Sequence, residues 1–200
     1  MKKPKYSLPE MKREVGDQLR ESASLKTHLA EREADAICRM AEIVTDSFRG
    51  GGKLLICGNG GSAADAQHLS GELVGRFLKE RAPLSCIALT VDTSILTSIG
   101  NDYGFEHVFS RQVAAHGRAG DVLLAISTSG NSPNVLRAVD EAHRLKMKVI
   151  ALSGGEGGAL AKAADLCITI PSQCCPRIQE GHATIGHIMC GLVEKSLFGE

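Results

Sequence analysis

The sequence predicts an α/β protein built on a doubly wound, five-stranded parallel sheet of the flavodoxin-like kind, preceded by a pair of helices. Short apolar runs fit strands that are buried on both faces, and segments of helical periodicity separate them. Strands that alternate with helices are typical of a parallel sheet covered on both sides. The predicted strands cover residues 53–57, 85–89, 121–127, 148–152 and 166–170.

The N-terminal quarter predicts two helices. Ser7 precedes Leu8-Pro9-Glu10, a helix-start signal with proline in the first turn, and a charged helix is expected to about residue 30. A second helix, about 31–49, carries an apolar stripe and ends at three consecutive glycines. We expect a loose tail at 1–6, a helical extension over 1–50 that packs on the core or on a partner subunit, and a sheet domain over 51–200.

The later helices are expected near 62–79, 92–100, 106–117, 132–146 and 157–164, and a long one, about 177–197, closes the chain. Doubly wound sheets bind their ligands at the carboxyl ends of the strands. The turns at 58–62 and 127–132 lie at such ends, so they are the candidate ligand sites.

The composition excludes several classes of function. The 23 basic and 23 acidic residues cancel, so the net charge gives no general attraction to nucleic acid or to an anionic membrane. No apolar run approaches the roughly 18 residues that span a bilayer, and the N-terminus lacks the apolar stretch of a signal peptide. The odd number of cysteines, 7, with Cys57, Cys86 and Cys167 in predicted strands, indicates buried free thiols in a reducing, cytoplasmic compartment.

The first turn, from Gly58 to Ala63, follows a buried strand and precedes a helix that Ser62 can cap. Such a unit leaves free backbone N–H groups at the positive end of a helix, which is an anion site. The turn formally matches the dinucleotide fingerprint GxGxxA, but the acidic residue that this fingerprint requires has only a late candidate, Asp92. A tight turn without a ligand is the alternative.

The second turn is a hydroxyl-rich loop, Ser127-Thr128-Ser129-Gly130-Asn131-Ser132, with Pro133 at the first position of the next helix. Its hydroxyl groups and the helix N-terminus favour binding of a phosphate or a sugar. Simple helix capping is the alternative.

His68 and Glu72 are four residues apart and share one helix face with Asp65, where a helix that merely covers a sheet would carry apolar residues. The pair could share a divalent ion, or Glu72 could act as a base beside a Lewis acid. An exposed His–Glu pair of little consequence is the alternative. Arg76, one turn further, could pair with Glu72 or bind a phosphate.

The closing helix carries Gln179, His182 and His187. Gln179 and His187 are separated by about 12 Å along the helix axis, which is near the limit for two side chains that meet at one ion. If both serve one site, a neighbouring subunit could supply one of them. For His182 we expect a solvated or capping role.

The segments CGNGGSAADAQH, STSGNS and RIQExH, together with Asn101-Asp102 in IGNDYGF, resemble the sugar isomerase (SIS) domain family, and within it the bacterial phosphoheptose isomerases. The resemblance extends over nearly the whole chain. It implies an aldose–ketose isomerase that converts sedoheptulose 7-phosphate into D-glycero-D-manno-heptose 7-phosphate through an enediol. This reaction is the first step of ADP- or GDP-heptose biosynthesis for surface glycans.

By position, the resemblance implies that Glu72 is the base and His187 the acid. It also implies a homotetramer with sites at subunit interfaces, and one zinc ion per subunit held by His68, Glu72, Gln179 and His187. The implied substrate-binding residues are Asn59, Gly60, Gly61, Ser62, Glu72, Asn101, Asp102, Ser127, Thr128, Ser129, Ser132 and Gln179. Pro176 departs from the pattern, because some members carry Asp there and proline makes no side-chain hydrogen bond.

Two non-catalytic alternatives come from the same family. A relative that associates with the replication initiator lacks the catalytic Glu and His, whereas this chain has both Glu72 and His187. Regulatory SIS modules that sense a phosphosugar usually come with a DNA-binding domain, and the sequence shows none.

Overall fold

The computed structural model describes residues 6–199, so the expected tail at 1–6 lies outside the described residues except for Tyr6. Five strands form one sheet in the order β2-β1-β3-β4-β5, and every neighbouring pair is parallel. This order confirms the predicted doubly wound, flavodoxin-like sheet. The strands are β1 Leu54–Gly58, β2 Cys86–Ala88, β3 Val122–Ser127, β4 Lys148–Gly154 and β5 Leu166–Ile170.

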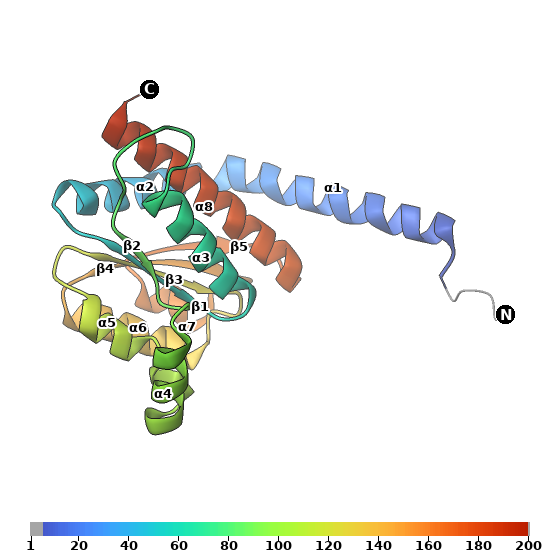
Figure 1. Cartoon of the computed structure of the whole chain (residues 1–200). Coiled ribbons are helices and arrows are strands. Elements are labelled where there is room, and N and C mark those ends of the chain that lie inside the picture. Colours follow the sequence, from blue (N-terminus) through green and yellow to red (C-terminus); the bar gives the residue numbers. More distant parts are fainter. Residues whose placement is uncertain (1–5, 200) are drawn as a thin grey trace.

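Helices cover both faces of the sheet (Figure 1). Successive strand residues point to opposite faces, so Leu54 and Ile56 pack under one layer of helices while Leu55 and Cys57 pack under the other. The first layer holds α1 Leu8–Arg32, α2 Ala34–Arg49, α3 Gly61–Val74 and α8 Cys175–Phe198. The second holds α4 Thr93–Tyr103, the 3-10 helix η1 Phe105–His107, α5 Ser110–His116, α6 Pro133–Arg144 and α7 Gly158–Ala163.

Two predicted helices differ from those observed. The helix expected over 62–79 ends at Val74, and residues 75–85 form a loop that leads to β2. The helix expected over 106–117 is divided into η1 and α5, which begins only at Ser110. The seven cysteines are free thiols, with Cys57 and Cys86 buried as expected and Cys167 half-buried.

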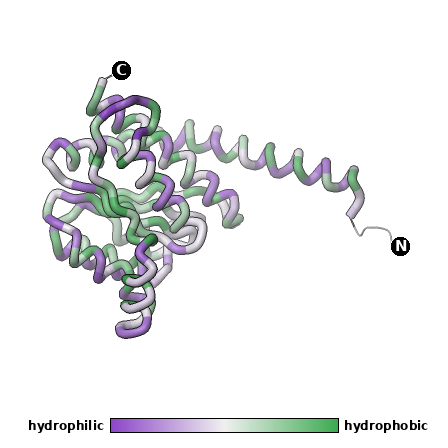
Figure 2. Tube along the Cα trace, viewed as in Figure 1, coloured by the Kyte–Doolittle hydropathy of each residue, from purple (hydrophilic) through white to green (hydrophobic). Residues whose placement is uncertain are grey.

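The first helix projects away from the sheet domain along most of its length (Figure 1), whereas α2 packs on α8 and β5. Hydrophobic residues recur along the exposed part of α1, at Leu8, Met11, Val15 and Leu19 (Figure 2). Only further along, at Leu25 and Leu29, do the apolar side chains of α1 enter the core. From Tyr6 to Gly199, none of the helices combines the length and apolarity needed to cross a membrane.

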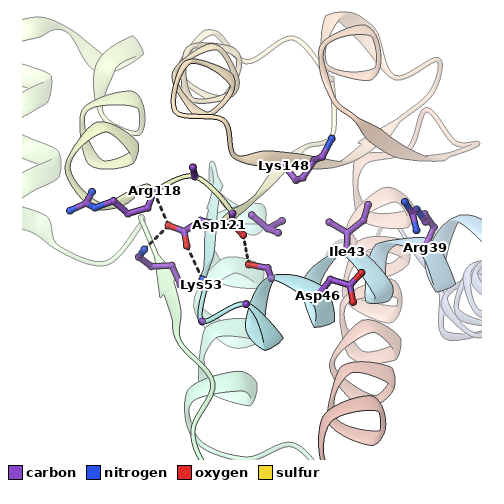
Figure 3. A pocket seen from close by; sticks show the side chains of 14 residues that line it. Arg39, Ile43, Asp46, Lys53, Arg118, Asp121 and Lys148 are labelled. Atoms are coloured by element: carbon purple, nitrogen blue, oxygen red, sulfur yellow. Dashed lines mark hydrogen bonds and ion pairs between the residues drawn. The ribbon is translucent and has the colours of Figure 1, made fainter.

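A network of buried charge joins the amino ends of the central strands (Figure 3). The carboxylate of Asp121, just before β3, accepts the backbone N–H of Lys53 at 2.9 Å, its ammonium at 2.5 Å and the backbone N–H of Arg118 at 2.8 Å. The same groove contains Arg39, which pairs with Glu42 at 3.0 Å, and Lys148, which pairs with Asp165 at 3.0 Å. These charges therefore have partners within the protein.

Candidate active site

Helices α3 and α8 lie side by side and run in the same direction (Figure 1). Glycines permit the close approach: a Cβ at Gly61 would lie 2.3 Å from Nε2 of Gln179, and one at Gly186 would lie 2.7 Å from Cδ2 of Leu69. A Cβ at Gly186 would force the buried Leu69 side chain to shift, and one at Gly61 would displace the end of the Gln179 side chain. The packing brings His68, next to Leu69, beside His187, next to Gly186.

Three of the predicted metal ligands meet where these helices touch. One ligand atom from each of His68, Glu72 and His187 lies within 4.8 Å of the other two. The Nε2 atoms of the two imidazoles are 2.6 Å apart, and Oε1 of Glu72 is 3.5 Å from Nε2 of His68. The His68 side chain is 51% exposed and that of Glu72 23%, so the cluster is open to a substrate on one side.

Asp65 extends this cluster toward the start of α3. One of its carboxylate oxygens, Oδ2, is buried and has no hydrogen-bond partner among residues 6–199. Burial raises the pKa of the Asp65 carboxyl, and the nearby imidazoles of His68 and His187 oppose that rise. Asp65 and Glu72, which share one helix face with His68, therefore both lie near the imidazoles of His68 and His187.

Gln179, the fourth predicted metal ligand, lies elsewhere within the chain. Its side chain lies against Gly61 in the first turn of α3, about two helical turns along α8 from His187. The geometric difficulty anticipated from the sequence is therefore present in the fold. A single chain brings together His68, Glu72 and His187 without Gln179.

The turn after β1 is built by glycine and by a pair of amides. Gly60 has φ +55, a left-handed conformation that glycine adopts without strain. Gly60 is also the N-cap of α3, so the expected capping by Ser62 is wrong; Ser62 lies buried in the first turn because the helix begins one residue before it. Asn59 exchanges two hydrogen bonds with Asn134 of α6, at 2.9 and 2.8 Å. These bonds hold the turn beside the second loop.

The second loop gathers its hydroxyl groups at the start of α6. Ser127 Oγ lies 2.9 Å from Ser132 Oγ and 3.5 Å from Ser129 Oγ, and α6 begins at Pro133 as predicted. Thr128 lies beside the start of α8, with its Oγ1 3.7 Å from Sγ of Cys175. The strands β1 and β3 are neighbours, so both turns occupy the same edge of the sheet, at the point where the strand order reverses.

Asn101 and Asp102, predicted as sugar contacts, lie on the exposed end of α4. They are joined to each other by a hydrogen bond of 2.7 Å from Asn101 Nδ2 to Asp102 Oδ1. Helix α4 projects from the sheet domain on the side opposite α3 and α8 (Figure 1). Within residues 6–199 no hydrogen bond links them to the His–Glu cluster.

His182 corrects an expectation, because it is neither solvated nor a cap. It is 1% exposed, and its Nε2 lies 3.0 Å from the carbonyl oxygen of Ser153 at the end of β4. Burial lowers the pKa of His182 to about 4, so the imidazole is neutral and donates that hydrogen bond. The hydroxyl of Ser153 in turn donates to the carbonyl of Ser127 at 3.1 Å. His182 is therefore linked through Ser153 to the start of the hydroxyl-rich loop.

Two other residues near the site were not found from the sequence. Phe77 stacks on the ring of His187, with centroids 5.8 Å apart and an interplanar angle of 21°. Asn134 pairs with Asn59, and its position after Pro133 in a helix start gave no signal. Arg76, for which the sequence left both pairing with Glu72 and phosphate binding open, lies 3.9 Å from Glu80.

Comparisons with known proteins identify the family. A model of the SIS domain family matches residues 18–154. A phosphoheptose isomerase from Rhodospirillum rubrum is 60% identical over 82% of this chain and 87% of its own length. Another, from a Geobacter species, is 53% identical over 94% of this chain and 98% of its own length.

Solved structures extend the likeness to three dimensions. Phosphoheptose isomerase from Neisseria gonorrhoeae matches with a TM-score of 0.88 at 45% identity, over 92% of this chain and 99% of that one. The Vibrio vulnificus NanR protein complexed with ManNAc-6P, at 17% identity and a TM-score of 0.61, covers 92% of this chain and 64% of its own and shares the fold alone. The chain therefore belongs to the SIS domain family, among its phosphoheptose isomerases.

Proposed function

We propose that the protein isomerises sedoheptulose 7-phosphate to D-glycero-D-manno-heptose 7-phosphate, the first step of heptose activation for surface glycans. The observation that carries this proposal is the convergence of His68, Glu72 and His187 where α3 packs on α8. The hydroxyl-rich loop lies at the start of α8, about 18 Å along the helix axis from His187. A proton-transfer group and an anion-binding loop suit a phosphorylated sugar whose other end carries a carbonyl, and we propose that a subunit interface brings the two together.

In the proposed reaction Glu72 and His187 divide the proton transfers. The Glu72 carboxylate takes a proton from carbon 1, next to the ketone, and returns it to carbon 2 after the enediol has formed. His187 gives a proton to the oxygen on carbon 2 and receives one from the oxygen on carbon 1. The Nε2 atom of His187 faces that of His68 at 2.6 Å, which supports a shared proton or a shared ion at this point.

The donor set suits a divalent metal ion. Two imidazole nitrogens and one carboxylate oxygen within 4.8 Å of one another match the ligands that zinc prefers. The chemistry that such an ion supplies is polarisation of the substrate carbonyl, which makes the neighbouring C–H acidic enough for a carboxylate base. Because Gln179 is about two turns away along α8, we propose that it reaches the ion only across a subunit interface.

Removal of the metal tests its role. A chelator, with metal content verified by elemental analysis, should lower turnover, and added zinc should restore it. Unchanged turnover after verified removal would contradict a chemical role for the ion.

The phosphate is proposed to lie in the second loop. The hydroxyl groups of Ser127, Thr128, Ser129 and Ser132 and the free N–H groups at the start of α6 are the donors that a phosphate accepts. Sugar hydroxyl groups are then proposed to contact the first turn and the end of α4, through Asn59, Gly60, Gly61, Ser62, Asn101 and Asp102. Asn101 and Asp102 project on α4, so a subunit contact is a natural way for them to reach a sugar.

We further propose a homotetramer in which residues 1–50 serve as an extension of a catalytic domain over 51–200. The exposed stripe of Leu8, Met11, Val15 and Leu19 supports this, because a contiguous apolar face on a projecting helix suits a subunit contact. Light scattering of the Val15→Asp variant should show a smaller assembly than that of the wild type. An unchanged tetramer would remove α1 from the interface.

The reaction itself is tested by incubating the protein with sedoheptulose 7-phosphate and identifying the products by NMR. An aldose 7-phosphate should accumulate to equilibrium, while fructose 6-phosphate tests whether chain length is read. Binding without turnover by folded protein would overturn the proposed reaction and indicate a phosphosugar-binding protein.

A further inference from the structure

The loop over residues 75–85 is held by one carboxylate from the far end of the chain. Glu194 of α8 accepts three successive backbone N–H groups, from Phe77 at 3.2 Å, Leu78 at 3.0 Å and Lys79 at 2.9 Å. Successive N–H groups that converge in this way form a concave anion site. The loop conformation is therefore fixed by the Glu194 carboxylate, whose side chain is 3% exposed.

Arg81 joins this carboxylate to the end of α3. Its Nε donates to Oε2 of Glu194 at 3.0 Å, and its two terminal nitrogens donate to the carbonyl of Leu73 at 2.7 Å and that of Glu72 at 2.8 Å. The last carbonyl groups of a helix lack partners within the helix, so a guanidinium group here caps α3. The side chain is 1% exposed.

The same loop contacts His187 through Phe77. The phenyl ring stacks on the imidazole, and a Cβ at Gly191 would already lie 3.4 Å from Cε1 of Phe77, so this part of α8 is shaped to receive the ring. The imidazole of His68 meets His187 from another side in an edge-on arrangement, with centroids 4.9 Å apart. The His187 ring is therefore confined by both neighbours.

We propose that Arg81 and Glu194 are positioning residues for the isomerase reaction. The Arg81 guanidinium fixes the backbone of Glu72, and the Glu194 carboxylate fixes the loop that presses Phe77 on His187. One buried ion pair thus sets the placement of the base and the acid together. The inference rests on the proposed roles of Glu72 and His187, because the buried side chains of Arg81 and Glu194 act through them.

The test compares Arg81→Lys and Phe77→Leu with the wild type. Lysine keeps the charge opposite Glu194 but lacks the fork that reaches both carbonyls, and leucine keeps an apolar side chain but removes the stack. Each variant should lower kcat by about 10- to 100-fold, since a misplacement of about 1 Å costs that order of rate, while KM stays within about twofold. Circular dichroism and urea titration at the assay temperature establish the folded fraction, to which kcat is referred.

A double variant separates positioning from loss of structure. Because Arg81 also holds the Glu194 carboxylate that fixes the loop of Phe77, adding Phe77→Leu to Arg81→Lys should lower kcat by less than the product of the two single effects. The matched control is Arg144→Lys, which alters an exposed pair with Glu141 on α6 and should leave kcat at the wild-type value. Multiplicative effects, or folded Arg81→Lys with full kcat, would overturn the proposal.

The proposed function fails in a different way. A wild type that does not convert sedoheptulose 7-phosphate removes the reaction, and a Glu72→Gln variant with normal turnover removes the base. If the wild type is active and Glu72→Gln is inactive, the proposed function holds. The kcat of Arg81→Lys then tests the positioning role by itself.

Discussion

Two polar clusters in the molecule use their side chains in opposite ways. At the amino edge of the sheet, the Asp121 carboxylate receives three hydrogen bonds, and its side chain is 3% exposed. Where α3 packs on α8, the side chains of His68 and Glu72 are 51% and 23% exposed, and their polar atoms face one another and His187. The first cluster is closed by its own contacts, while the second leaves donors and acceptors for a ligand.

This difference separates stability from chemistry within one domain. A buried carboxylate that is fully hydrogen-bonded ties strands together, and changing it destabilises the protein. A partly exposed cluster of metal-binding side chains stabilises the fold little and acts on what binds to it. Substitutions in the two clusters should therefore affect different measurements.

The largest effect is expected in the cluster between α3 and α8. Glu72→Gln keeps the size of the side chain but removes the proton acceptor, so turnover of sedoheptulose 7-phosphate should fall by about 10²- to 10⁴-fold, the usual contribution of a general base. His187→Asn should have a similar effect through loss of the acid. Steady-state kinetics measures both.

Neither change should unfold the protein, because both side chains are partly exposed. The urea midpoint should stay close to that of the wild type. Near-normal turnover by Glu72→Gln would refute its role as the base, and a large loss of stability would show that this cluster is not separate from the core.

The second effect is expected at the amino edge, in stability alone. Asp121→Asn removes the charge that Lys53 faces at 2.5 Å and leaves the ammonium without its counter-charge, so unfolding should become easier by about 3 kcal/mol. Urea denaturation measures the loss. Turnover of the folded variant should match that of the wild type.

Asp46 provides the control on the same groove. Its side chain is 72% exposed and lies 3.6 Å from Arg49, so Asp46→Asn should change stability by less than about 0.5 kcal/mol. Equal losses from the two substitutions would contradict the importance of burial at this edge.

The sheet was predictable because its signals are local. A strand buried on both faces reads as an apolar run, and β3, predicted over 121–127, is observed at Val122–Ser127. The 75–85 loop was not predictable, since its conformation depends on Glu194, which lies 117 residues from Phe77 in the chain. The residues of the loop contain no sequence signal for a partner so distant in the chain.

The candidate site divides in the same way. The spacing of His68 and Glu72 on one helix predicted their proximity, and the two side chains lie 3.5 Å apart. The meeting with His187 depends on the packing of α3 on α8, which only the resemblance to a family indicated. His182 was misjudged because histidine is usually at least partly exposed, whereas here a carbonyl at the end of β4 gives its imidazole a buried partner.

The third effect tests whether a buried residue at the carboxyl edge behaves like the amino edge. Burial lowers the pKa of His182 to about 4 in the folded protein, whereas a histidine in the unfolded chain has a pKa of about 6.5. Between these two pH values the unfolded chain binds a proton at this position and the folded protein does not. Its contribution to stability is therefore present above pH 6.5 and is lost as the pH falls toward 4. Between pH 7.5 and 5 this loss should amount to about 2 kcal/mol.

Urea titrations at both pH values measure that loss, and His182→Gln should reduce it. The exposed His28 on α1 is the control, because His28→Gln should leave the pH dependence as it is in the wild type. If the free energy of unfolding of His182→Gln depended on pH as it does in the wild type, burial of His182 would not be the cause of the pH dependence.

The smallest effect compares two lysines of the amino edge. Lys53 and Lys148 line one groove and each pairs with an aspartate, but the Asp121 side chain is 3% exposed whereas that of Asp165 is 31% exposed. Lys148→Met should change stability by less than about 1 kcal/mol, and salt should reduce even that difference. Lys53→Met should be several times more harmful, because it leaves a buried carboxylate without its cation. If both variants lost the same free energy of unfolding in urea, the distance between the charges alone would set the strength of these pairs. Unequal losses would show that burial of the aspartate sets it.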